Sequence, residues 1–147
     1  MIADSIGKQI QEAMKAHDEI RLSTLRMLLS ALNYEKIAKQ HELSSDEEIT
    51  VVQREAKKRK DAIDAYEKVC AMDRAEKEKI ELTILGEFLP EQLSENELER
   101  IVDETISELS AVSVSDLGRV IGAVMVKVKG RADGRVVSEL VKGRLTK

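Results

Sequence analysis

The sequence contains few aromatic residues and little proline. Only 2% of its 147 residues are aromatic, and it has no tryptophan, one phenylalanine and one proline. Alanine, glutamate, lysine, leucine and arginine are abundant instead, and these residues favour α-helices. The core must therefore be built from aliphatic side chains, and we predict an all-α fold.

Cysteine is also scarce, because Cys70 is the only one and cannot form an internal disulfide. A lone thiol is typical of a reducing compartment. The N-terminal residues lack the basic segment and apolar run of a signal peptide, and no stretch approaches the ~18 apolar residues that span a membrane. We expect a cytoplasmic protein without membrane contact. Cys70 falls on a predicted apolar helix stripe, so we expect it to be a small buried packing residue.

Catalytic side chains in a recognisable arrangement are missing too. His17 and His41 both fall at predicted helix ends, and neither has Cys or His neighbours at metal-ligand spacing. The carboxylates are scattered along helix faces, and the sequence has neither a P-loop nor a dinucleotide-binding glycine motif. We therefore expect no catalytic residue, no metal, no cofactor and no enzymatic activity of the isolated chain.

Apolar residues recur at helical spacing along the whole chain. The pattern predicts four longer helices, which end near residues 17, 39, 70 and 88, and then three shorter ones. Pro90 ends the fourth helix, because proline disfavours helical geometry in the residue before it. The predicted helices therefore fall into two groups that divide near Pro90.

Capping signals mark most of the predicted helix starts. Ser94 gives the strongest one, since Leu93 and Leu98 have the spacing of a hydrophobic staple around it. We expect Gly130 to end the sixth helix and Asp133 to begin the seventh. The predicted caps are Ser45 with Glu48, Asp73 with Glu76, Ser94 with Glu97, and Ser113 between a staple of Val112 and Leu117.

Two features inside the predicted helices allow more than one interpretation. Gly118 and Gly122 interrupt the sixth helix at a cost of up to ~1 kcal/mol each relative to alanine. Close packing of another helix is the interpretation we favour, with close approach of a ligand as the alternative. The basic run from residue 54 to residue 60 spreads around the third helix, while Arg59 falls on its apolar stripe. We expect a solvated face plus one buried or interface ion pair, with RNA contact as the alternative.

Charge is distributed unevenly along the chain, whose net charge of −4 argues against a general nucleic-acid coat. Residues 117–147 contain eight basic and two acidic residues, a net charge of +6. The preceding 116 residues contain 16 basic and 26 acidic residues, a net charge of −10. Such asymmetry indicates a localised anionic partner.

The basic residues concentrate at the link between the last two predicted helices. Val128 is predicted to point inward there, so that the neighbouring basic side chains project into solvent. The following helix start offers unpaired N–H groups and the positive end of the helix dipole to a phosphate. A turn with solvated lysines is the alternative. The predicted phosphate contacts are Lys127, Lys129, Arg131 and Arg135, together with Gly130 and Gly134, whose backbone N–H groups we expect to be accessible.

Several strings of residues resemble the GatB/YqeY family, specifically its small stand-alone YqeY-like proteins. The resemblance covers essentially the whole chain in order. One departure is Val126, where many relatives have proline; valine permits an unbroken helix to Val128. The matching strings are LSTLRML (residues 22–28), REAKKRKD (54–61), FLPEQLS (88–94), GRVIGAVM (118–125) and KVKGRADG (127–134).

The resemblance implies a four-helix bundle in residues 1–90 followed by a three-helix tail bundle in residues 91–147. Similar tail domains belong to the B subunit of the Asp/Glu-tRNA amidotransferase and to some glutaminyl-tRNA synthetases, where they hold tRNA outside the reacting end. The amidation itself, a carbon–nitrogen ligase reaction with glutamine as nitrogen donor, belongs to other domains.

We therefore predict a non-catalytic accessory module that binds tRNA for an amidotransferase or an aminoacyl-tRNA synthetase. Stand-alone members of the family that the chain resembles are often assigned carbon–nitrogen ligase activity by association, but the residues of this chain give no support for independent activity. The rival interpretation is a helical protein–protein adaptor that does not bind RNA, with its acidic N-terminal part as the docking surface.

Overall fold

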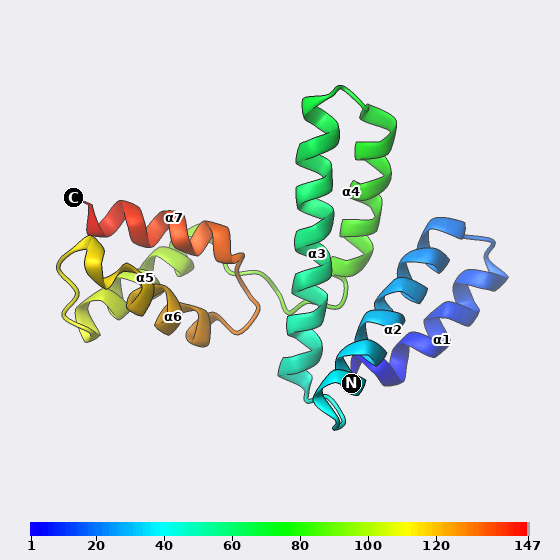
Figure 1. Cartoon of the computed structure of the whole chain (residues 1–147), viewed down its shortest axis with the longest axis horizontal. Helices are drawn as coiled ribbons and strands as arrows, with labels where there is room; N and C mark the ends of the chain where they lie inside the picture. Colours follow the sequence, from blue (N-terminus) through cyan, green and yellow to red (C-terminus); the bar gives the residue numbers. More distant parts are fainter. Residues whose placement is uncertain (147) are drawn as a thin grey trace. The chain divides into compact units, whose positions relative to one another are not determined.

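The computed structural model describes residues 1–146, which form seven α-helices and no strand (Figure 1). The predicted all-α class is confirmed for these residues. The chain divides into two compact units, unit 1 (Met1–Leu89) and unit 2 (Pro90–Lys147). Unit 1 contains α1 (Ile2–Lys15), α2 (Glu19–Lys39), α3 (Ser45–Lys68) and α4 (Met72–Gly86); unit 2 contains α5 (Glu95–Glu108), the short 3₁₀ turn η1 (Val114–Asp116), α6 (Leu117–Val128) and α7 (Gly134–Leu145).

Unit 1 is built from two helical hairpins. α1 pairs with α2, α3 pairs with α4, and α2 packs against both helices of the second hairpin. In Figure 1 the hairpins diverge from the end where α2 finishes and α3 begins. Each fully buried leucine or isoleucine at their junction contributes about 1.5–3 kcal/mol of transfer free energy. The largest fully buried aliphatic side chains in this core are Ile6, Leu25, Leu28, Leu32, Val51, Val52 and Leu85.

Unit 1 also buries a group of charged side chains. Arg59 on α3 is only 6% exposed. Its guanidinium pairs with Glu55 one turn earlier and with Glu81 on α4, both at 3.2 Å. The buried ion pair predicted within the basic run is therefore confirmed. These three groups hold α3 against α4 only while all of them are present, because removing one leaves an unpaired buried charge that costs several kcal/mol.

A carboxylate from α3 caps the start of α1. Glu48 is 1% exposed, and its two oxygens accept the backbone N–H groups of Ile2 at 2.8 Å and Ala3 at 3.1 Å. The predicted capping box of Ser45 with Glu48 is wrong. The box lies one residue earlier, where Ser44 and Glu47 satisfy each other's backbone N–H groups. Glu48 points instead toward the positive end of the α1 dipole.

Unit 2 has a core dominated by valine. Its three helices pack against one another, and the buried valines are fully shielded from solvent. The capping box predicted at Ser94 and Glu97 is confirmed: Ser94 Oγ accepts the Glu97 N–H at 3.3 Å, and the Glu97 carboxylate accepts the Ser94 N–H at 2.9 Å. The fully buried valines are Val102 on α5, Val120, Val124 and Val128 on α6, and Val137 and Val141 on α7.

Three predictions about helix ends and packing are wrong. Cys70 is exposed rather than buried, because α3 ends at Lys68 and Cys70 adopts a left-handed conformation with φ 58°. Val112 is 86% exposed and forms no staple, since η1 precedes α6. Asp73 does not cap α4, which begins at Met72 without a side-chain cap.

Candidate nucleic-acid interface

The link between α6 and α7 is shaped by two consecutive left-handed residues. We expected Gly130 to end α6, but Lys129 takes the capping position with φ 43° and ψ 53°. Gly130 follows with φ 82°, a conformation that only glycine adopts readily. The Arg131 N–H then donates to the Val128 carbonyl at 2.9 Å, which closes a tight turn. The turn presents Lys129 and Arg131 on the surface of unit 2.

Hydrogen bonds tie this turn to the segment that precedes α5. The Leu93 N–H donates to the Arg131 carbonyl at 2.8 Å, and the Gln92 side-chain amide donates to the Gly130 carbonyl at 3.3 Å. Arg131 Nε donates to the Glu91 carbonyl at 3.2 Å. These contacts bury Gly130, so its role in the fold is to make the turn. They also fix the backbone of Arg131 and the Nε atom of its guanidinium.

The start of α7 already carries an anion. As predicted, Asp133 caps this helix: its carboxylate accepts the Arg135 N–H at 2.9 Å. That carboxylate uses one of the donors that we expected a phosphate to use. Gly134 is exposed, and a Cβ there would meet only Met125 Cε, at an ordinary 3.8 Å. An external phosphate would therefore be bound mainly by the basic side chains and less by the N–H groups at the start of α7.

The four predicted basic residues all have exposed side chains at one end of unit 2. They extend from the last turn of α6, through the link, to the first turn of α7. Lys127 pairs with Glu108 at the end of α5. Among the described residues, no carboxylate lies within ion-pair distance of Lys129 or Arg131. Of the four predicted residues, Lys129 and Arg131 are thus the ones most open to an external anion.

Arg131 also influences the capping box of α5 electrostatically. The pKa of Glu97 lies below its usual range, mainly because the Ser94 N–H donates to its carboxylate. The positive charge of Arg131 lowers the same pKa to a smaller extent. Arg131 therefore lies close enough to α5 to act on Glu97 without pairing with it.

Elsewhere in unit 2 two arginines of the basic segment pair with acidic residues. Arg119 pairs with Asp116 at 3.1 Å, and Arg144 pairs with Asp103 at 3.0 Å and with Glu99 at 3.6 Å. The unit as a whole has nine basic and ten acidic residues, a net charge of −1. These ion pairs partly neutralise the strongly positive segment seen in the sequence. A charge count along the chain missed this because the balancing carboxylates come from α5 and η1.

The two glycines inside α6 do not lie under another helix. Gly118 and Gly122 are exposed, and a Cβ built at either position meets no heavy atom of the described residues within 4 Å apart from the adjoining residues and backbone of α6 itself. The close packing that we favoured is therefore wrong. Val126, which is 70% exposed, continues their spacing of four residues along the helix. α6 runs unbroken through Val126, as expected for valine at that position.

Neither a metal site nor a membrane span is found within residues 1–146. No group of three His, Cys, Asp or Glu side chains in this range is placed to hold a metal ion. None of its helices has both the length and the apolar character needed to cross a membrane.

Comparison with known proteins identifies the family. A family model described as Yqey-like protein matches residues 3–145. The chain belongs to the YqeY-like protein family. This YqeY-like chain is also 33% identical, over 89 residues, to an uncharacterized protein of Schizosaccharomyces pombe. That alignment covers 60% of this chain and 72% of the yeast protein.

Two further relatives are much larger proteins, both of them subunits of a glutamyl-tRNA(Gln) amidotransferase. The YqeY-like chain is 40% identical over 57 residues to the subunit from Thermococcus gammatolerans. It is 43% identical over 58 residues to the protein of the same name from Aeropyrum pernix. The alignments cover 36% and 37% of this chain but only 9% of each relative. The YqeY-like chain thus matches a small part of each amidotransferase protein.

Proposed function

We propose that the chain is a non-catalytic tRNA-binding module that holds tRNA for an amidotransferase or an aminoacyl-tRNA synthetase in the cytoplasm. In this proposal residues 1–90 act as a four-helix bundle and residues 91–147 as a three-helix tail bundle. The main support is the α6–α7 link, where Lys129 and Arg131 project from a hydrogen-bonded turn. The similarity to a part of two amidotransferase subunits adds a reason to choose tRNA as the anion.

The chemistry of the link suits phosphate groups. Lysine offers a compact positive charge, and an arginine guanidinium can donate two parallel hydrogen bonds to a phosphate. Arg131 is held through Nε, which orients the rest of its guanidinium. Contacts of this kind position a nucleic acid but do not read its bases. No aromatic residue lies between Val128 and Arg135, so we expect binding without base stacking at this link.

The exposed glycines of α6 extend the same proposal. Each glycine costs up to ~1 kcal/mol of helix stability relative to alanine, and no packing inside the described residues compensates for it. Without a Cβ, the helix backbone at Gly118 and Gly122 lets a ligand approach closely. We propose that the tRNA backbone follows this face of α6 toward the link, so that the two glycines allow close approach of a ligand.

The test is a titration of fluorescent tRNA with the full-length protein, followed by anisotropy at several salt concentrations. Replacing Lys127, Lys129, Arg131 and Arg135 together by alanine should weaken binding by more than about tenfold. Arg131→Ala alone should lower the slope of log affinity against log salt by about 1. The matched control replaces four exposed lysines of unit 1 by alanine: Lys8, Lys15, Lys57 and Lys68.

The control variant removes the same charge and should change tRNA affinity much less. Unchanged affinity of the link variant, or an equal loss in the control, would reject the link as the tRNA site. Absence of tRNA binding by the wild-type protein at low salt would favour the rival function, a protein–protein adaptor. That rival has one observation in its favour, since Tyr34 and Ile37 leave apolar surface exposed on α2.

A further inference from the structure

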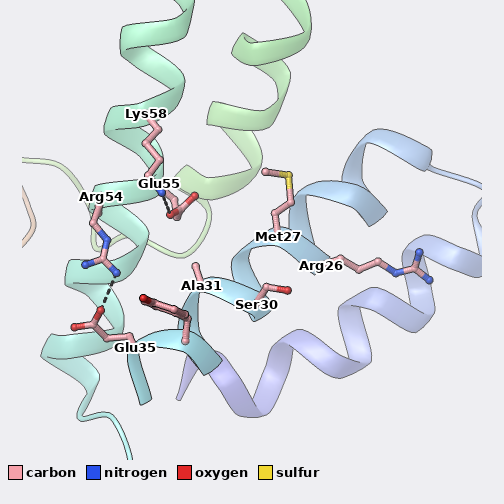
Figure 2. Close-up of a pocket in the computed structure, with 9 residues that line it drawn as sticks. Arg26, Met27, Ser30, Ala31, Glu35, Arg54, Glu55 and Lys58 are labelled. Atoms are coloured by element: carbon pink, nitrogen blue, oxygen red, sulfur yellow. Dashed lines mark hydrogen bonds and ion pairs between the residues drawn. The ribbon is translucent and has the colours of Figure 1, made fainter. Parts of the chain in front are cut away.

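A cleft of about 610 Å³ opens between α2 and α3 of unit 1 (Figure 2). Its volume lies within the range of about 300–1,000 Å³ that is typical of ligand sites. The cleft is lined only by residues of unit 1, so it shares no residue with the proposed tRNA site on unit 2. No residue of the α6–α7 link contributes to its lining.

The apolar part of the cleft comes from one face of α2. Met27, Ala31 and Tyr34 line it, with spacings of four and three residues that bring them onto one stripe of the helix. This is the spacing of a coiled-coil seam. Tyr34 is 74% exposed, and Met27 is also exposed. Exposed aromatic and methionine side chains in a depression are typical anchors for a protein partner.

Three cations flank this stripe. Arg54 and Lys58 on α3 and Arg26 on α2 all line the cleft, and Figure 2 shows the Arg26 side chain extending away from Arg54 and Lys58, toward α1. Arg54 pairs with Glu35 at 2.9 Å, and Lys58 pairs with Glu55 at 2.7 Å. Among the described residues Arg26 has no carboxylate partner, and its nearest polar contact is Met14 Sδ at 3.9 Å. The lining therefore combines an apolar stripe with three cations and two carboxylates, and its one net positive charge comes from Arg26.

These features suit an acidic amphipathic helix better than a nucleic acid. Glu35 and Glu55 both line the cleft, and unit 1 has 15 basic and 18 acidic residues, a net charge of −3. A continuous phosphate backbone would be repelled by these groups. A helix can instead place single carboxylates opposite the cations and lay its apolar face on the stripe.

We propose that the α2–α3 cleft of unit 1 binds an amphipathic helix of another protein. The apolar face of that helix covers Met27, Ala31 and Tyr34. Carboxylates on its flanks pair with Arg26, Arg54 and Lys58. This site goes beyond tRNA binding and does not depend on it, because the two surfaces share no residue.

The proposal can be tested by selecting a displayed library of three-heptad helical peptides on the full-length protein. Each seam position of the library encodes an aliphatic residue, and each flanking position encodes either Glu or Lys. We expect the selected peptides to carry Glu at the flanks. Their affinity, measured by anisotropy, should fall about tenfold or more with Tyr34→Ala and with Arg26→Glu.

Matched controls lie close to each substitution. Ile37 is 75% exposed on the same helix but does not line the cleft, so Ile37→Ala should leave peptide affinity unchanged. Lys57 is exposed on α3 outside the cleft, so Lys57→Glu controls for the charge change of Arg26→Glu. All four side chains are exposed, and circular dichroism should show that each variant is folded.

Three results would overturn the proposal. These are a selection that yields no binder, binders with Lys at the flanks, and binders equally sensitive to Ile37→Ala and Tyr34→Ala. A loss of tRNA affinity in Tyr34→Ala and Arg26→Glu, without any peptide binding, would assign the cleft to RNA instead. Because the link variant with four alanines retains this cleft, it should still bind the peptides even if it has lost tRNA.

Discussion

The two units of the chain hold their helices together in different ways. Unit 1 buries four charged side chains, Glu48, Glu55, Arg59 and Glu81, and uses them to connect α1, α3 and α4. In unit 2, the described core has one buried polar side chain, Thr105, which donates to a carbonyl of its own helix at 2.7 Å. Unit 1 thus depends on specific polar partners, whereas unit 2 depends on the shape of a valine core.

This difference affects which charges are available at the surface. In unit 2, ion pairs lie on the outside, where each contributes little to stability. Its basic side chains can therefore change partners when an anion binds, at small cost to the fold. The ion pairs around Arg59 in unit 1 cannot exchange in this way, because removing one partner leaves another charge buried.

The largest expected effect comes from breaking the buried charge group. Arg59→Met should reduce the free energy of unfolding of unit 1 by about 3–5 kcal/mol, because Glu55 and Glu81 lose their buried partner. Hydrogen exchange followed residue by residue will show whether unit 2 keeps its stability. Arg54→Met is the matched control: its exposed pair with Glu35 should cost less than about 1 kcal/mol. Equal losses in the two variants would mean that the buried network has no special role.

The corresponding test in unit 2 concerns its valine core. Val124→Ala should cost about 2 kcal/mol, because it removes two buried carbons and leaves a cavity. Chemical denaturation monitored by signals from unit 2 measures this loss. Val126→Ala on the same helix is exposed and should change stability by less than about 0.5 kcal/mol. A similar loss in both variants would contradict the core described for unit 2.

The two capping boxes provide a test in which the units should behave alike. Ser44→Ala and Ser94→Ala should each cost ~1 kcal/mol, since each removes the hydroxyl that accepts a first-turn N–H. Thermal unfolding with probes in each unit should show the loss only in the unit that carries the substitution. Ser107→Ala, on an exposed position within α5, should have little effect. A loss shared by both units would show that they unfold as one.

A smaller effect of opposite sign is expected on the exposed face of α6. Gly122→Ala should stabilise unit 2 by about 0.5–1 kcal/mol, because the site is helical and the space beside it is open. The same substitution should weaken tRNA binding if the ligand approaches this face. Gly130→Ala is the contrasting variant and should destabilise unit 2, because φ is 82° there. Stabilisation with unchanged tRNA affinity would exclude this face of α6 from the interface.

The smallest expected effect is a difference in titration between the two capping glutamates. The pKa of Glu47 is lowered from 4.5 to about 2, first by the hydrogen bond from Lys39 and then by the Ser44 N–H. Its contribution to stability is therefore present above about pH 4.5 and is lost as pH falls toward 2. Lys39→Ala should raise the pKa of Glu47 and leave that of Glu97 unchanged, as measured by NMR titration of the carboxyl groups. A Glu47 pKa that stays near 2 in this variant would contradict the assigned cause.

Local signals in the sequence predicted much of this fold. The spacing of Ser94 and Glu97 was sufficient to predict the capping box of α5, because both partners lie in one helical turn. The segment around residue 45 contains two possible capping boxes, Ser44 with Glu47 and Ser45 with Glu48. The first one forms, because Glu48 instead binds the start of α1, which is distant in the sequence. A contact between residues so far apart in the chain leaves no local signal.

The predicted site shows the same division between local and distant effects. The exposure of Lys127, Lys129, Arg131 and Arg135 follows from the inward position of Val128 and was predictable. The pairing of Lys127 with Glu108 was not, because it depends on how α5 packs. The α2–α3 cleft also escaped sequence reasoning, since its two walls come from separate helical hairpins.

The carboxylate of Glu48 has a consequence for the order in which the chain acquires structure. The first two N–H groups of α1 have their acceptor on α3, more than 40 residues further along the chain. During synthesis, the first turn of α1 therefore lacks this acceptor until α3 has been made and has docked. The first turn of α1 is consequently completed late, and it opens again whenever the near end of α3 lifts away.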